Sequence, residues 1–225
     1  PGEISRFFSM RTTAVPPARG ERVSAHNGLV QRPLLEAGGL GKAAQVFGDD
    51  LTSLLAEINE RMPRTHGNTV VPLSRIKAYT LTDRPLHEAI PEPATAVEDR
   101  IGELISELVE DGATLQMGVG AIPNAVLARL GNKHHLGVHT EMFSDGLIPL
   151  IEGGVVTNRC KEVHRGRTVT SFVAGSSKLY EFVHDNLLVE FHPCDRTNDT
   201  SLISRNPKVV AINAALEIDL TGQVC

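Results

Sequence analysis

Two short segments of this sequence hold residues whose types and spacing suit acyl-transfer chemistry. A carboxylate, Glu141, lies at the end of a strand-like run, within Gly137–Gly146. The preceding strand-like run ends in a glycine turn that leads into a helix, formed by Gly118, Val119, Gly120, Ala121, Ile122 and Pro123. A carboxylate can act as a nucleophile that forms a covalent acyl intermediate, and backbone N–H groups can stabilise the developing negative charge. Together the segments predict a covalent acyl-transfer site.

The glycine turn taken by itself leaves more than one interpretation open. A G-x-G between a strand and a helix is part of the dinucleotide-binding fingerprint, but that fingerprint requires a third glycine where this chain has Pro123. Proline suits the first turn of a helix, where its missing N–H costs nothing. We therefore disfavour a dehydrogenase, whereas a tight turn that binds no ligand is as compatible with the pattern as an anion-binding turn.

Glu141 also has a simpler alternative, because a lone glutamate after a strand is most often a solvated loop charge. Asp145 follows nearby, and we interpret it as the N-cap of a helix over Leu147–Ile151 rather than as a second acid. Ser144 has no Ser–His–Asp context that spacing can verify, so a serine nucleophile is disfavoured.

From residue 96 onward, strands alternate with helices. Apolar spacing predicts helices at 97–108, 124–130, 147–151 and 176–183, and strands at 114–117, 136–139, 168–173, 187–191 and 209–212. This alternation predicts an α/β fold, a mostly parallel sheet with flanking helices. Ligands of such sheets bind at the carboxyl ends of the strands, where both segments fall.

The first part of the chain is less regular. Residues 1–48 are broken by glycines and prolines and are predicted to be irregular. A helix is predicted over Asp50–Arg61 from Leu51, Leu54, Leu55 and Ile58, with short strands at 70–73 and 76–81. Prolines 85, 91 and 93 mark a linker, so we place a domain boundary near residue 95.

Composition excludes several classes of protein. The 225 residues carry a net charge of −5, which does not suit a nucleic-acid-binding surface. The uncharged apolar runs are too short for a membrane span. Three cysteines without C-x-x-C spacing, and histidines without an H-E-x-x-H motif, predict no disulfide framework and no metal site. A reducing, cytoplasmic location is therefore expected.

The set and order of several motifs resemble the acetyl-CoA hydrolase/transferase family, and within it the 4-hydroxybutyrate and acetate or butyrate CoA-transferases. The similarity covers about residues 50–225 and is carried by Glu57–Gly67, Asp111–Leu127, Gly137–Gly146, Thr170–Phe172, Lys178–Tyr180 and Asn213–Val224. This order of motifs is far more specific than a G-x-G turn.

The resemblance implies two similar α/β domains with the active site between them. It implies that Glu141 is the nucleophile of an acyl-CoA:carboxylate CoA-transferase that acts through a glutamyl-CoA thioester. It implies that Gly118–Pro123 lines the CoA and oxyanion region. Coenzyme A is then a substrate rather than a permanently bound cofactor, a small carboxylate is the partner substrate, and the full-length parent is a homo-oligomer.

The resemblance also implies a division of the chain. Residues 49–95 correspond to a remnant of the N-terminal domain with its linker, and residues 96–225 to a truncated C-terminal domain. Residues 1–48 do not resemble the family, and its chains extend beyond Cys225, so we expect a fragment. An acyl-CoA hydrolase and an inactive CoA-binding fragment remain as alternatives.

Overall fold

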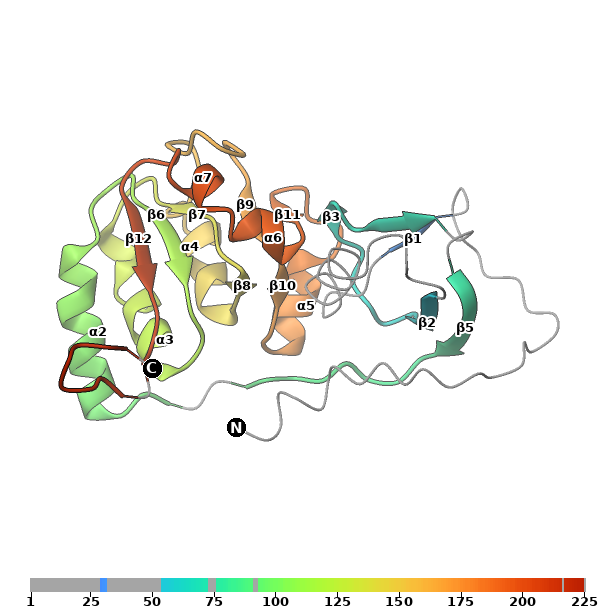
Figure 1. Cartoon of the computed structure of the whole chain (residues 1–225), viewed down its shortest axis with the longest axis horizontal. Coiled ribbons are helices and arrows are strands. Elements are labelled where there is room, and N and C mark those ends of the chain that lie inside the picture. The colour runs from blue at the N-terminus through green and yellow to red at the C-terminus, as the bar shows by residue number, and fades with distance from the viewer. Residues whose placement is uncertain (1–28, 32–53, 73–75, 91–92, 216, 225) are drawn as a thin grey trace.

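The structure is a computed structural model that describes residues 29–31, 54–72, 76–90, 93–215 and 217–224. Strands and helices alternate along most of this length, and the strands of the main sheet run parallel (Figure 1). The predicted α/β fold class is therefore confirmed. In this described part of the chain, no helix is long and apolar enough to cross a membrane.

Two three-stranded parallel ladders join into the main sheet. One has the order β12–β6–β7 and the other β9–β11–β3, and His139 beside β7 bridges Val169 of β9. The bounds are β12 Val209–Ile212, β6 Thr114–Met117, β7 Gly137–Val138, β9 Thr168–Thr170, β11 Val189–Phe191 and β3 His66–Gly67. The central strands β6, β7 and β9 are almost fully buried, as expected where helices cover both faces of a parallel sheet.

The core lies between this sheet and three helices. These are α3 (Ala121–Leu127), α4 (Ile148–Glu152) and α5 (Ser177–Val183), and each contributes buried apolar side chains to the same cluster as the strands. Short 3-10 helices follow α3 at Leu130–Asn132 (η5) and precede α4 at Asp145–Leu147 (η6).

Two strands of the sheet are interrupted side by side. After β7 the chain resumes as β8 (Met142–Phe143), and after β9 it resumes as β10 (Phe172–Val173), which pairs in parallel with β8. The predicted strand over 168–173 is thus split at Ser171. At the break, the Glu141 carbonyl accepts both the Ser171 N–H at 2.8 Å and the Phe172 N–H at 3.1 Å. Such irregularities turn a side chain away from the sheet and often lie beside active sites.

Helix α2 (Ala96–Leu108) begins with the capping box of Thr95 and Glu98. The prediction that its apolar residues form one buried face is only partly correct, because Val97, Leu104 and Leu108 are exposed. The helix instead packs through Gly102, where an added Cβ would lie 2.8 Å from Ala125 of α3. Close approach of the two backbones, rather than a leucine stripe, therefore fixes α2.

The predicted helix over Asp50–Arg61 is wrong where the structure describes it. Residues Leu54–Asn59 form strand β2, which pairs in parallel with β5 (Ile76–Thr82). Leucines at helical spacing also suit a short buried strand, and pairing with a distant segment decides between them. Residues 50–53 lie outside the described part.

Of the predicted irregular segment 1–48, only 29–31 are described, and they form β1 (Leu29–Gln31), antiparallel to β4 (Val70–Pro72). The predicted strands at 70–73 and 76–81 are confirmed as β4 and β5 within the described residues.

The predicted linker is extended from residue 83 to residue 90 and lies against the start of α5. The Ala89 N–H donates to the Gly175 carbonyl at 2.9 Å, and Tyr180 Oη donates to the His87 carbonyl at 2.5 Å. Glu88 Oε2 accepts the Ser177 N–H at 2.7 Å. The domain boundary near residue 95 stays a prediction.

Candidate functional site

The glycine turn and the Glu141 segment lie next to each other, joined by Thr140. The buried Thr140 hydroxyl accepts the Met117 N–H at 3.0 Å and donates to the Met117 carbonyl at 3.0 Å. Met117 immediately precedes Gly118, and Thr140 immediately precedes Glu141. The structure therefore brings together the two segments that the sequence singled out.

The turn itself is shorter than predicted. Strand β6 ends at Met117 and helix α3 begins at Ala121, so only Gly118, Val119 and Gly120 connect them. The other three predicted residues, Ala121, Ile122 and Pro123, form the first turn of α3. A proline is tolerated there because the first amides of a helix have no partner within it, and α3 thus starts earlier than the predicted Asn124.

The two glycines are required for different reasons. Gly120 has φ of 114° and ψ of −177°, a conformation that is essentially restricted to glycine, and no atom lies within 4 Å of where its Cβ would be. Gly118 has no such conformation, but a Cβ there would lie 2.7 Å from Asn213 Oδ1. Close packing against the end of β12 explains Gly118, and the backbone path explains Gly120.

Glu141 is held by side chains from a distant part of the sequence. Its Oε2 accepts the Asn198 Nδ2–H at 2.6 Å, and its Oε1 accepts the Cys194 thiol at 3.4 Å. Glu141 is half-buried. A carboxylate with a donor on each oxygen is fixed in direction, which argues against the alternative of a freely solvated loop charge.

Both donors belong to helix α6 (Cys194–Thr197) and its C-cap, Asn198, which sequence reasoning missed. The segment follows directly after β11 and is rich in polar residues. In parallel sheets such segments gather with other strand ends. The position of this polar segment after a strand could have pointed to the site from the sequence. The spacing of residues, however, does not link Asn198 to Glu141.

Helix α6 is anchored to the broken strands through Thr197. Its hydroxyl lies 2.5 Å from the Ser171 hydroxyl, and its carbonyl lies 3.0 Å from His139 Nε2. Because a carbonyl only accepts, His139 carries its proton on Nε2. Burial, with a smaller contribution from the nearby Lys161, lowers the pKa of His139 to about 4. A neutral imidazole therefore supports the helix that holds Glu141.

Asp145 does not cap the helix that follows it, so that interpretation is wrong. Its Oδ2 accepts the Ser176 N–H at 2.9 Å and its Oδ1 accepts the Ser176 hydroxyl at 2.5 Å. Asp145 thus serves the start of α5, where the Ser176 side chain makes no capping bond of its own. Ser144 donates to Asn124 Oδ1 at 3.4 Å, a contact between the Glu141 segment and α3.

Arg64 and His66 contact Asp185 at the edge of the main sheet. His66 Nε2 lies 3.0 Å from Asp185 Oδ1, and Arg64 Nε lies 3.7 Å from the same oxygen. These contacts join the start of β3 to Asp185, which follows α5 in the sequence.

The chain is similar in sequence to a known protein family and to several characterised relatives. Residues 175–225 match the model of the acetyl-CoA hydrolase/transferase C-terminal domain. The succinyl-CoA:acetate/propanoyl-CoA:succinate CoA transferase of Fasciola hepatica is 47% identical over 174 residues, 77% of this chain and 36% of that protein. The 4-hydroxybutyrate coenzyme A transferase of Clostridium kluyveri is 45% identical over 172 residues, 76% of this chain and 40% of that protein.

Solved structures agree with these relatives. The crystal structure of RipA from Yersinia pestis is 36% identical, with a TM-score of 0.78 over 88% of this chain and 45% of that one. A 4-hydroxybutyrate CoA-transferase from Porphyromonas gingivalis is 39% identical, with a TM-score of 0.72 over 76% of this chain and 44% of that one.

The chain spans 36 to 40% of the length of the two curated relatives named above. Within that span the fold, the family model and the relatives all agree. The chain belongs to the acetyl-CoA hydrolase/transferase family.

Proposed function

We propose that this chain carries the nucleophile of an acyl-CoA:carboxylate CoA-transferase, and that the nucleophile is Glu141. The observation that carries the proposal is the pair of hydrogen bonds that Cys194 and Asn198 donate to the Glu141 carboxylate. The CoA-transferase names of the relatives supply the reaction class.

The first step is attack by a Glu141 carboxylate oxygen on the thioester carbonyl of an acyl-CoA. The C–S bond breaks, CoA leaves as its thiolate, and a mixed anhydride remains. The thiolate then attacks the glutamyl carbonyl and expels the acyl group as a free carboxylate, which leaves a glutamyl-CoA thioester. An acceptor carboxylate reverses both steps, and the new acyl-CoA departs with Glu141 restored.

The two hydrogen bonds divide the roles of the carboxylate oxygens. A contact from a thiol at 3.4 Å is weaker than one from an amide at 2.6 Å. We assign Oε1 as the attacking oxygen, because it loses the weaker of the two hydrogen bonds when it forms the new bond. Oε2 stays with Asn198, which then stabilises the negative charge on that oxygen when the thiolate attacks the glutamyl carbonyl.

The glycine turn is proposed to contribute backbone donors to the same reaction. Gly120 and Val119 are exposed, and open space faces Gly120. Glycine allows a ligand to approach the backbone closely. Thr140 joins this turn to the Glu141 segment through Met117. Gly118–Pro123 therefore suits the CoA and oxyanion region that the family resemblance implies.

The substrates of the proposed site are an acyl-CoA, acetyl-CoA or 4-hydroxybutyryl-CoA in type, and a small carboxylate. CoA enters as a substrate and not as a resident cofactor. The full-length parent is proposed to act as a homo-oligomer.

The deciding experiment is intact mass spectrometry of the chain after incubation with acetyl-CoA or butyryl-CoA. A covalent CoA adduct is expected, which borohydride removes by reducing the thioester at Glu141 to an alcohol that peptide mapping locates. Glu141→Gln should abolish the adduct. Glu152→Gln, which changes an exposed glutamate of α4, should leave it intact.

The remaining outcomes separate the alternatives. Hydrolysis of acyl-CoA that proceeds without an acceptor carboxylate would support an acyl-CoA hydrolase. Binding of CoA by calorimetry without any adduct would support a non-catalytic CoA-binding fragment. An adduct that persists in Glu141→Gln would exclude Glu141 as the nucleophile.

A further inference from the structure

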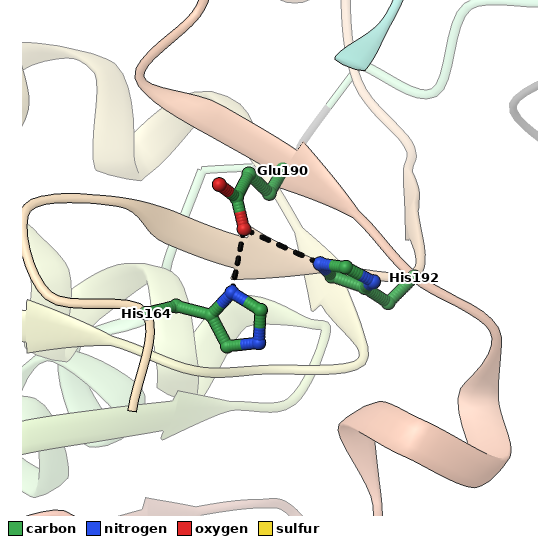
Figure 2. A group of neighbouring side chains, drawn as sticks. All are labelled: His164, Glu190 and His192. Carbon is green, nitrogen blue, oxygen red and sulfur yellow. Dashed lines mark hydrogen bonds and ion pairs between the residues drawn. The ribbon is translucent and has the colours of Figure 1, made fainter. Parts of the chain in front are cut away.

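Two histidines and a glutamate converge on one point at strand β11 of the main sheet. Figure 2 shows His164 and His192 pointing their rings at the Glu190 carboxylate. His164 Nδ1 lies 2.6 Å from Glu190 Oε2, and His192 Nε2 lies 3.3 Å from the same oxygen. One potential ligand atom from each residue lies within 4.8 Å of the others.

The backbone explains why these side chains meet. Glu190 belongs to β11, and His192 follows two positions later in the same extended run, so both side chains project to one face. His164 comes from the loop before β9 and adopts a left-handed φ of 53°. A non-glycine residue rarely holds that conformation unless its surroundings fix it.

The loop that carries His164 is held at several points. Asn158 Oδ1 accepts the Val138 N–H at 2.8 Å, and the Gly166 N–H donates to the Asn158 carbonyl at 2.9 Å. The buried Lys161 donates to the Val138 carbonyl at 2.8 Å and to the Arg167 carbonyl at 2.7 Å. These bonds fix the loop on the sheet, so the three side chains are positioned before any ligand arrives.

The donor set matches that of a divalent transition metal. Two imidazole nitrogens and one carboxylate oxygen form three-ligand zinc sites in which a fourth position stays open. The three side chains are 17%, 25% and 12% exposed for His164, Glu190 and His192, so an ion can reach them without unfolding the sheet.

Burial and hydrogen bonding shift the pKa values of His192 and Glu190. Burial is the largest effect on His192 and lowers the pKa of its ring, which the hydrogen bond to Glu190 opposes. For Glu190, burial acts to raise the pKa, but hydrogen bonds from His192 and His164 outweigh it, and the pKa lies below its ordinary value.

Two arginines compete with a cation at this cluster. Arg196 Nη2 lies 3.3 Å from His164 Nε2, and Arg167 Nε lies 3.8 Å from Glu190 Oε1. A metal on His164 Nδ1 would place the ring proton on Nε2, where Arg196 no longer finds an acceptor. Arg196 is exposed and can swing away.

We propose that His164, Glu190 and His192 form a binding site for a divalent transition-metal ion of the zinc class, with Arg196 as its competitor. Arg196 lies in α6, between the two residues that donate to Glu141. Occupation of the site is therefore coupled to the position of α6. The proposal does not depend on Glu141 being a nucleophile.

Titration of the chelator-treated chain with Co²⁺ tests the site directly. Four-coordinate Co²⁺ bound by nitrogen and oxygen gives visible absorption bands, and one ion per chain is expected, displaced by Zn²⁺. His164→Asn keeps a residue that tolerates positive φ and should weaken binding more than about 100-fold, since even outer-shell changes cost about 10- to 100-fold.

The matched control is His135→Asn, because His135 also has a positive φ, of 58°, and is an exposed residue outside the cluster. It should leave the affinity for Co²⁺ unchanged. Arg196→Gln removes the competing cation and should tighten binding several-fold. Circular dichroism checks that each variant is folded.

Paramagnetic NMR of the Co²⁺-loaded wild-type chain gives a readout that needs no variant. Shifted, exchangeable imidazole N–H signals from two histidines are expected. Absence of a saturable Co²⁺ spectrum, absence of the shifted imidazole signals, or equal affinity in wild type and His164→Asn would each overturn the proposal.

Discussion

Asn198 donates its side-chain amide to Glu141 Oε2 across 2.6 Å, although the two residues are 57 positions apart in the chain. The contact exists because β11 ends beside the interrupted strands and α6 turns back over the break. Thr197, the preceding residue, is held there by Ser171 and His139. The direction of the Glu141 carboxylate therefore depends on how three separate segments pack.

Asn198→Ala is expected to slow formation of the CoA adduct by about 100-fold, in the range found when one oxyanion donor is removed. The change takes away the donor to Oε2 without altering Glu141. Asn132→Ala, at an exposed position of η5, is the matched control. Rates are measured by quenched intact mass spectrometry, and an unchanged rate in Asn198→Ala would contradict the assigned role of Oε2.

Gly120→Ala is expected to destabilise the chain by about 1–3 kcal/mol, the usual cost of a disallowed backbone conformation. Steric contact cannot be the cause, because nothing lies within 4 Å of the added methyl group. Gly131→Ala has equally open surroundings but no positive φ, so it should change stability little. Urea denaturation of both variants measures the difference, and equal stability would refute the conformational argument.

The sequence pattern predicted the strands, helices and turns whose structure depends mainly on the residues within them. Strands β6 and β12 match their expected bounds, Thr114–Met117 and Val209–Ile212. Helix α2 forms where Thr95 and Glu98 supply a capping box. The glycine turn was located correctly, but its length was not, because α3 takes in Ala121 to Pro123.

The remaining features depend on partners that are far away in the sequence. Leu54–Asn59 has leucines at helical spacing, yet pairing with β5 makes it a strand. Glu141 was singled out as the nucleophile, but its donors come from Cys194 and Asn198, which no spacing rule connects to it. The cluster of His164 with Glu190 and His192 has no local motif either, since a loop supplies His164, β11 supplies Glu190, and His192 follows the end of that strand.

Asp145→Ala is expected to lower the free energy of unfolding by about 1–3 kcal/mol, because it leaves polar groups at the start of α5 without their acceptor. Asp145 accepts both the backbone N–H and the hydroxyl of Ser176. Ser176→Ala removes only the hydroxyl donor and should cost less. Asp83→Ala, at an exposed linker position, is the control. If Asp83→Ala and Asp145→Ala were equally destabilising in chemical denaturation, the contact between Asp145 and Ser176 would contribute no more to stability than an exposed carboxylate does.

The buried Lys161 should make the chain more stable as pH rises from about 7 towards 10. Burial lowers its pKa from 10.5 to about 7, and the attraction of Glu190 opposes that shift only in part. His139, whose own pKa is lowered to about 4, stays neutral in this range. Between pH 7 and pH 10 the unfolded chain therefore holds a proton that the folded chain has lost, so stability rises by up to about 1.4 kcal/mol per pH unit.

Urea denaturation at a series of pH values measures this slope. Lys161→Met should flatten it, even though the variant also loses the bonds to the carbonyls of Val138 and Arg167. Lys178→Met alters an exposed lysine and should keep the wild-type slope. A wild-type free energy of unfolding that stays level or falls between pH 7 and pH 10 would show that Lys161 remains charged in the folded chain, with its two carbonyl acceptors and Glu190 compensating for burial.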